Sequence, residues 1–125
     1  MKAVVVSPGK QKSVRVQEIP EPKLNESQIL VKTNFVGVDG TDREINEALY
    51  GEAPEGLDYL VIGHEVLAEV IQVGKNVEGF QKGDLIVPTV RRPGKCIYCK
   101  AGQQDMCIDG QYTERGIKGA HGYLS

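Results

Sequence analysis

The sequence has little net charge of either sign. Its 15 Lys and Arg residues nearly balance its 17 Asp and Glu residues, which gives a formal net charge of −2. There is no basic stripe and no run of like charges, so the composition does not favour nucleic acid or an anionic membrane as a partner. Small neutral or polar molecules are favoured instead.

Long hydrophobic runs are also missing. The first ten residues, MKAVVVSPGK, hold only four consecutive apolar residues, and no later run is long enough to cross a bilayer. We therefore expect no secretory signal and a cytoplasmic location. Cysteine is scarce, and its three copies, Cys96, Cys99 and Cys107, lie within twelve residues of one another. In a reducing compartment this odd, tight cluster indicates metal thiolates rather than a disulfide framework.

Dinucleotide and phosphate fingerprints are absent as well. No two glycines stand two positions apart, so the chain has no G-x-G-x-x-G motif, and it has no P-loop. Its 125 residues, 40% of them hydrophobic, match the size and balance of one globular domain. If the protein uses a dinucleotide, we expect the cofactor domain to lie outside this chain.

Short β-branched runs separated by glycine and proline predict a mainly β, barrel-like fold. The predicted strands are residues 3–6 and 13–19, which should form a hairpin, and residues 29–38, 66–73 and 84–90. Residues 122–125 look like the start of another strand. Residues 41–49 predict a short helix with Thr41 or Asp42 as its N-cap. The glycine-rich stretch from 91 to 122 is too long for an ordinary loop unless a ligand or metal organises it.

A first candidate metal site lies around His64 and Glu65, between an apolar run and a predicted strand. An imidazole and a carboxylate are suitable zinc ligands, and a catalytic zinc needs a third. Asp39, on a glycine-flanked turn after the strand at 29–38, can present that carboxylate. A surface His-Glu pair and an Asp39 that only caps a turn are the alternatives left open by these residues.

The cysteine cluster is the stronger metal signal. Cys96-x-x-Cys99 followed by Cys107 supplies three soft thiolates at a spacing that suits one structural zinc. The redox interpretation of C-x-x-C is weaker because no βαβ pattern surrounds it. A fourth ligand must come from Asp105, Asp109 or a more distant residue, unless the site is vacant or completed by water.

Residues 63–88, GHEVLAEVIQVGKNVEGFQKGDLIVP, resemble the signature of zinc-containing medium-chain alcohol dehydrogenases, and the similarity extends over nearly the whole chain. The resemblance implies a GroES-like catalytic domain over residues 1–125, a partly open barrel with a zinc-binding lobe at about 91–115. It also implies a catalytic zinc, a structural zinc and a Rossmann domain that this chain does not contain.

Two further stretches resemble the glucose dehydrogenases of archaea: residues 37–44, and residues 87–96 together with 114–123. By that match His64 and Glu65 correspond to catalytic-zinc ligands. Thr41 corresponds to the hydroxyl that contacts substrate and relays its proton, and Glu114 to a residue that binds sugar hydroxyls. Asp39 stands where most relatives have a cysteine ligand, which keeps the negative charge but makes the site harder.

The lobe departs from the wider family too. Pro93 occupies the position of the first lobe cysteine, so the structural site has three thiolates, and Asp109 is the predicted fourth ligand by similarity to archaeal relatives. Glu114 could instead be a solvated carboxylate beside Arg115, and Thr41 only an N-cap. His121 is left without a role.

The resemblance implies an NAD- or NADP-dependent glucose 1-dehydrogenase that oxidises the C1 hydroxyl of glucose, or of a related aldose, to the lactone with the help of zinc. Another zinc polyol or alcohol dehydrogenase of the family is one alternative. A non-catalytic GroES-like module that binds metal or sugar is the other. Relatives suggest a tetramer or dimer for the full-length protein, and this chain alone is expected to be inactive because it has no cofactor site.

Overall fold

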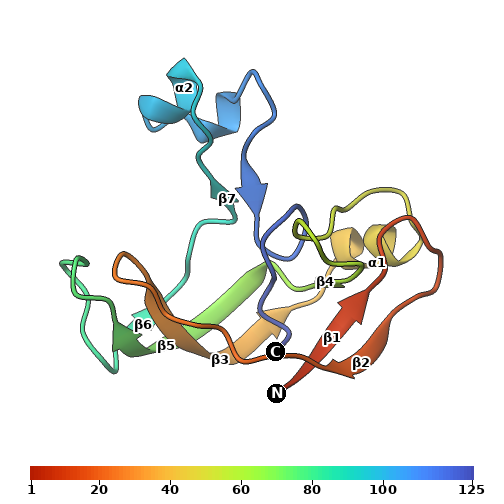
Figure 1. The fold of residues 1–125 in the computed structure, drawn as a ribbon, viewed down its shortest axis with the longest axis horizontal. Helices are drawn as coiled ribbons and strands as arrows, with labels where there is room; N and C mark the ends of the chain where they lie inside the picture. The colour runs from red at the N-terminus through yellow and green to blue at the C-terminus, as the bar shows by residue number, and fades with distance from the viewer.

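Strands and turns form most of the structure, a computed structural model that describes residues 1–125 (Figure 1). The strands are β1 (Lys2–Val6), β2 (Arg15–Glu18), β3 (Ile29–Gly37), β4 (Leu60–Val61), β5 (Glu65–Val73), β6 (Leu85–Ile86), β7 (Arg91–Arg92) and β8 (Thr113–Glu114). The helices are α1 (Gly40–Asn46), α2 (Ile97–Lys100) and a 3-10 turn, η1 (Gln104–Met106). The predicted mainly β architecture with a few short helices is confirmed.

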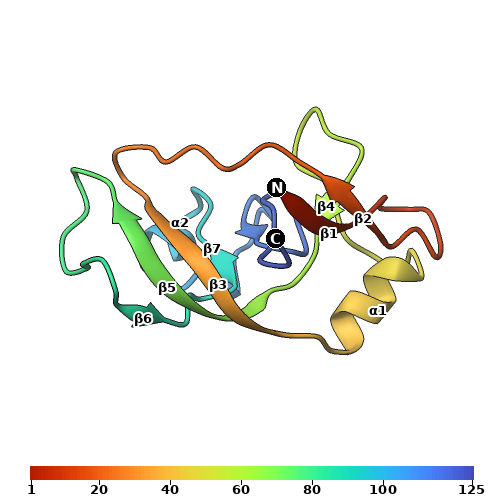
Figure 2. The same ribbon diagram turned by 90° about the horizontal axis from the view of Figure 1, so that it is seen from below.

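The strands form three small antiparallel sheets. Their strand orders are β2-β1-β4, β3-β5-β6 and β7-β8. β1 and β2 form the predicted hairpin, and β3 and β5 form the longest pair, lying side by side along the body of the molecule (Figure 2). Each of these two strands is nine residues long. This pair brings the end of β3 next to the start of β5, where Gly37 lies opposite Glu65.

Helix α1 follows β3 and begins one residue earlier than predicted. Its N-cap is Asp39, not Thr41 or Asp42, and the Asp39 side chain accepts a hydrogen bond from the Thr41 amide. Asp42 occupies the third helical position and completes a capping box by accepting from the Asp39 amide. Three of the four residues at positions 39–42 can cap a helix, so the local sequence alone does not identify the N-cap.

Two predicted strands differ from the structure. The strand at 84–90 shrinks to β6, because only Leu85 and Ile86 pair with β5 and Pro88 has no N–H to continue a ladder. Residues 122–125 do not form a regular strand. They still run against β4, since the Gly122 amide donates to the Val61 carbonyl at 2.7 Å.

The hydrophobic core is small and lies where β1 and β4 meet α1. It contains two clusters of five buried residues: Ala3, Val5, Ile19, Tyr59 and Val61, and Val6, Ile45, Leu60, Ile62 and Ile117. Val66, Ala68 and Val70 of β5 are also buried. Ile45 attaches α1 to the second cluster and is fully buried. Because α1 packs there, the core fixes the residues at the start of this helix. No helix in the structure is both long enough and apolar enough to span a membrane.

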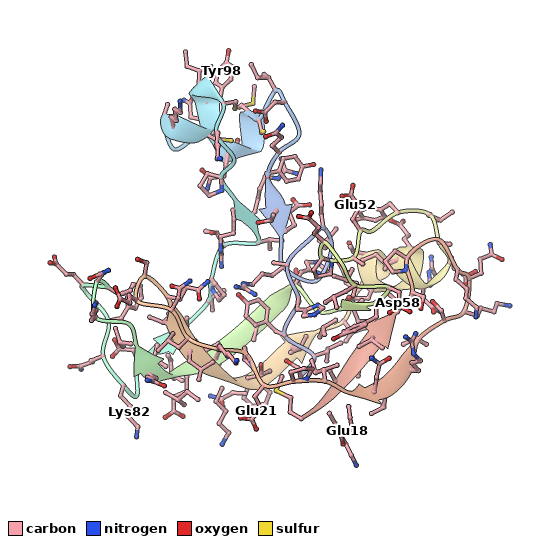
Figure 3. All side chains as sticks on the ribbon, viewed as in Figure 1. Glu18, Glu21, Glu52, Asp58, Lys82 and Tyr98 are labelled. Carbon is pink, nitrogen blue, oxygen red and sulfur yellow. The ribbon has the colours of Figure 1, made fainter.

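Residues 91–114, from the first residue of β7 to the last residue of β8, project from the body, and we call them the cysteine lobe (Figure 1). β7 and β8 form its base, and α2 and η1 lie at its tip, with Tyr98 at the outer end (Figure 3). Cys99 is the only buried residue in the lobe. The lobe therefore has almost no hydrophobic core of its own.

Candidate functional site

His64 and Glu65 lie at the junction between β4 and β5. The turn before them requires glycine, because Gly63 has a φ of +91° and an added Cβ would lie 2.9 Å from Leu124 Cγ. Glu65 opens β5 opposite Gly37, where an added Cβ would lie 2.6 Å from Glu65 Oε2. The absence of a side chain at Gly37 thus gives the Glu65 carboxylate its space at the end of the β3–β5 pair.

The structure brings the three predicted ligands of the body together. One ligand atom from each of Asp39, His64 and Glu65 lies within 4.8 Å of the other two. His64 Nε2 is 3.9 Å from Asp39 Oδ1, and the imidazole is buried whereas both carboxylates are exposed. A neutral imidazole with two carboxylates is a donor set that zinc accepts, and it leaves room for a water or substrate ligand. The residues therefore fit a catalytic type of metal site, which we call the body site.

Asp42 is a residue of this site that sequence reasoning missed. Its carboxylate is only 3% exposed, and it accepts hydrogen bonds from the amides of Asp39 and Gly63, both at 3.2 Å. Its Oδ1 lies 4.0 Å from Nδ1 of His64, a buried nitrogen that has no hydrogen-bond partner. Asp42 thus holds the backbone of Asp39 and of Gly63, the residue before His64, and it places a carboxylate near the outer nitrogen of the imidazole without a hydrogen bond to it.

Thr41 lies in the first turn of α1, directly after the Asp39 turn, and is half-buried. Its amide donates to Asp39 Oδ1 at 2.8 Å, which orients the carboxylate. The backbone of Thr41 therefore supports the body site, and the predicted role of its hydroxyl in proton relay stays a prediction.

The three thiols of the cysteine lobe also converge. Their sulfur atoms all lie within 4.8 Å of one another, and Cys96 Sγ is 3.9 Å from Cys107 Sγ. Cys96 is the N-cap of α2 and accepts from the Cys99 amide at 3.4 Å. This hydrogen bond is the main reason that the pKa of Cys96 falls to about 7, which favours the thiolate that metals bind.

Asp109 lies beside this cluster, as predicted for a fourth ligand. Cys107 Sγ donates to Asp109 Oδ1 at 3.0 Å, and this contact is the main cause of a Cys107 pKa raised to about 11 and of a lowered Asp109 pKa. Asp105 is placed differently, because its backbone carbonyl accepts from Arg91. Three sulfurs and an adjacent carboxylate make a donor set that fits a structural zinc, and the identity of the fourth ligand stays a prediction.

Glu114 lies at the base of the lobe in β8, and its partner differs from the alternative considered in the sequence. It pairs with Arg91 across the β7–β8 ladder, and Arg91 Nε donates to Glu114 Oε1 at 2.8 Å. Arg115 instead donates to the His121 carbonyl. The Glu114 side chain is only 15% exposed, so it is not a freely solvated carboxylate.

His121 has a structural role. Its Nδ1 accepts from the Val61 amide at 3.3 Å, and its ring stacks on Tyr59 with the centroids 5.2 Å apart. Burial, helped by the nearby positive charge of Arg115, lowers the pKa of His121. The neutral ring thus ties the segment before the C-terminus to β4.

Residues 25–124 match the family model of the alcohol dehydrogenase GroES-like domain, so this chain belongs to that family. Among curated relatives it is 51% identical over 127 residues to the glucose 1-dehydrogenase of Methanocella arvoryzae and 53% identical over 125 residues to that of Thermoproteus tenax. Each comparison covers 100% of this chain and 35% of the relative. The chain therefore spans about a third of the length of these relatives.

The fold comparison agrees. The structure of Haloferax mediterranei glucose dehydrogenase in complex with NADP, Zn and gluconolactone matches with a TM-score of 0.86 and 46% identity, over 100% of this chain and 35% of that one. An NAD-dependent alcohol dehydrogenase matches with a TM-score of 0.80 and 26% identity, over 98% of this chain. The GroES-like architecture inferred from residues 63–88 is thereby confirmed.

Proposed function

We propose that this chain is the zinc- and sugar-binding domain of an NAD(P)-dependent glucose 1-dehydrogenase. The observation that carries the proposal is the convergence of Asp39, His64 and Glu65, in a chain that aligns over its whole length with glucose dehydrogenases. The reaction takes a hydride from C1 of the sugar to the nicotinamide and releases the C1 hydroxyl proton, which yields the lactone and NAD(P)H.

Asp39, His64 and Glu65 are the residues that would hold the catalytic zinc. When bound, zinc would supply a Lewis acid that lowers the pKa of the C1 hydroxyl. Asp39 offers a hard carboxylate oxygen where most relatives offer a soft thiolate of the same charge, so we expect this site to be less selective for zinc among divalent metals. The Asp42 carboxylate, which accepts from the amides of Asp39 and Gly63, would keep the turns that carry Asp39 and His64 in place before the metal binds.

The other predicted residues have separate tasks in this proposal. Thr41, beside Asp39, would pass the hydroxyl proton toward solvent, and Glu114 would accept hydrogen bonds from sugar hydroxyls. Cys96, Cys99, Cys107 and Asp109 would hold the structural zinc. NAD or NADP would be bound by the part of the protein that corresponds to the remaining length of the relatives.

Two wider expectations accompany the proposal. The cytoplasm stays our predicted location, because three closely spaced free thiols suit a reducing compartment. A homo-oligomer, tetramer or dimer, stays our prediction for the full-length protein.

Zinc content per chain is the first test, with Asp39→Ala, Cys96→Ala and the control Asp58→Ala measured beside the parent. Asp58 is an exposed acid with no hydrogen bond in the structure. We expect one zinc ion for each cluster, the first lost with Asp39→Ala, the second with Cys96→Ala, and neither with Asp58→Ala. A folded parent chain without zinc would refute the proposed chemistry.

The second test measures NAD(P)H formation during the oxidation of glucose, other aldoses, sorbitol and simple alcohols by the full-length gene product, with NADP and NAD in parallel. Glucose with either nucleotide should give the highest kcat/KM. A better polyol or alcohol substrate would identify another dehydrogenase of the family. Zinc binding without any oxidation would identify a non-catalytic module.

A further inference from the structure

Arg91 and Glu114 form a hydrogen-bonded ion pair where the cysteine lobe joins the body. The two residues are register partners in the two-residue ladder of β7 and β8, and the guanidinium meets the carboxylate at 2.8 Å. Their side chains are 32% and 15% exposed. A carboxylate that is so little solvated needs a hydrogen-bond partner from the protein, and Arg91 supplies one.

The Arg91 guanidinium is itself held from several sides. Its Nη1 donates to the Asp105 carbonyl in η1 at 3.3 Å, and its Cζ lies 3.9 Å from the centroid of the Tyr112 ring. The planar guanidinium can stack on an aromatic ring and donate in plane at the same time, which the ammonium of lysine cannot do. Arg91 is therefore a rigid partner, held by the folded lobe before the sugar binds.

Glu114 retains one free oxygen. Arg91 uses Oε1, and Oε2 makes no hydrogen bond in the structure. A carboxylate held by one oxygen and open at the other can accept a hydroxyl proton donor in a defined direction.

We infer that Arg91 is a positioning residue for sugar recognition, which orients Glu114 so that its second oxygen accepts a hydrogen bond from a sugar hydroxyl. The inference rests on the proposed function, in which Glu114 binds the sugar. It also makes the lobe part of the substrate site, because the same guanidinium that holds Glu114 is anchored on η1, between Cys99 and Cys107.

Arg92 provides a matched control. It is the next residue of β7, has the same charge, and donates to the carbonyl and hydroxyl oxygens of Thr89 rather than to Glu114. Arg92→Met and Arg91→Met therefore remove equal charge from adjacent positions, and only the second removes the partner of Glu114.

The experiment uses the full-length gene product with Arg91→Met, Arg91→Lys, Arg92→Met, Glu114→Gln and the double variant Arg91→Met/Glu114→Gln. Arg91→Met should raise the KM for glucose about tenfold or more, with kcat changed by less than about threefold and the KM for the nucleotide unchanged. Arg91→Lys should raise it less, and Arg92→Met should not raise it. The double variant should be no worse than Glu114→Gln alone, because both changes remove one interaction.

Discrimination between glucose and a series of monodeoxyglucoses is a measurement that a loss of stability should not change. The parent should discriminate most strongly against the sugar that lacks the hydroxyl bound by Glu114. Arg91→Met and Glu114→Gln should both lose discrimination against that same sugar. If Arg91→Met does not fold, Arg91→Lys is used in its place, and it should also lose discrimination against that sugar.

The outcomes separate the two proposals. A parent that oxidises no aldose overturns the proposed function. A parent active on glucose whose KM rises with Glu114→Gln but not with either Arg91 variant overturns this inference alone. An unchanged KM in Glu114→Gln removes the sugar contact on which the inference rests, while the proposed glucose oxidation would stand.

Discussion

The body site and the cysteine lobe hold their candidate ligands in opposite ways. Asp39, His64 and Glu65 lie at the ends of nine-residue strands and at the start of a helix that packs on the core. The three thiols lie on single turns of helix and loop in a lobe where only Cys99 is buried. The body is shaped by its own packing, whereas the lobe has little besides its ligands to hold it together. We therefore expect the candidate body site to be preformed and the folding of the lobe to depend on a bound metal ion.

The largest expected effect of this difference comes from removing metal. With a strong chelator, the backbone amides of residues 96–109 should lose their protection from hydrogen exchange, while those of β1 and β5 keep theirs. Structural zinc in small domains contributes on the order of 10 kcal/mol of apparent folding free energy, and the lobe has no hydrophobic core to replace it. Exchange measured by NMR distinguishes the two regions. Equal loss of protection in body and lobe would show that the two are not independent.

Two variants sharpen this first prediction. Cys99→Ser should reproduce the loss of protection in the lobe while zinc is present. Asp39→Ala should leave the lobe protected, because its side chain belongs to the body site.

The second prediction concerns the packing that preforms the body site. Ile45→Ala removes a fully buried side chain from the cluster under α1, and it should lower the free energy of unfolding by about 2–5 kcal/mol in urea. Leu49→Ala is the control, because Leu49 is 71% exposed and its loss should change stability by less than about 0.5 kcal/mol. Similar effects from the two variants would argue against α1 as the support of the site.

Asp42→Asn tests whether the negative charge of Asp42 contributes to metal binding at the body site. The amide has nearly the same shape as the carboxylate but no negative charge beside His64 Nδ1, so zinc affinity at the body site should fall about ten- to hundredfold. Competition with a chromophoric chelator measures this affinity. The lobe site should keep its affinity. Glu44→Gln, an exposed change on the same helix, should leave both sites as they are.

Much of the body could be predicted from sequence because its signals are local. The run from Val66 to Val73 has the β-branched content of a strand, and the adjacent His64 and Glu65 mark where that strand begins. The C-x-x-C spacing likewise indicates a thiolate site without any knowledge of the fold. In each case, residues close in sequence carry the information.

The missed features depend on contacts between distant residues. The buried Asp42 carboxylate accepts from the Gly63 amide, 21 positions away, and Arg91 meets Glu114 through a ladder of only two residues in each strand. Nothing near either residue in the sequence sets these pairings, since they arise from the tertiary packing of β3, β5 and the lobe base. The sequence predicts Thr41 or Asp42 as the N-cap of α1, and Asp39 only as the cap of a turn, because all three side chains can cap a helix.

The smallest expected effect is a pH dependence of the stability of the body, to which the lobe does not contribute. Burial lowers the pKa of His121 below its usual 6.5, so the unfolded chain binds this proton more readily than the folded chain. The contribution of His121 to stability is therefore complete above about pH 6.5, and it declines as the pH falls from there toward the lowered pKa of the folded state.

His121→Asn separates this titration from the other acid-sensitive groups. Asparagine can still accept the Val61 amide but cannot be protonated, so the variant should lose less stability than the parent between about pH 7.5 and 5.5. Urea unfolding followed by far-UV circular dichroism at each pH measures the difference. Parallel curves for the two proteins would mean that the ring of His121, although stacked on Tyr59, does not control the acid response of the body.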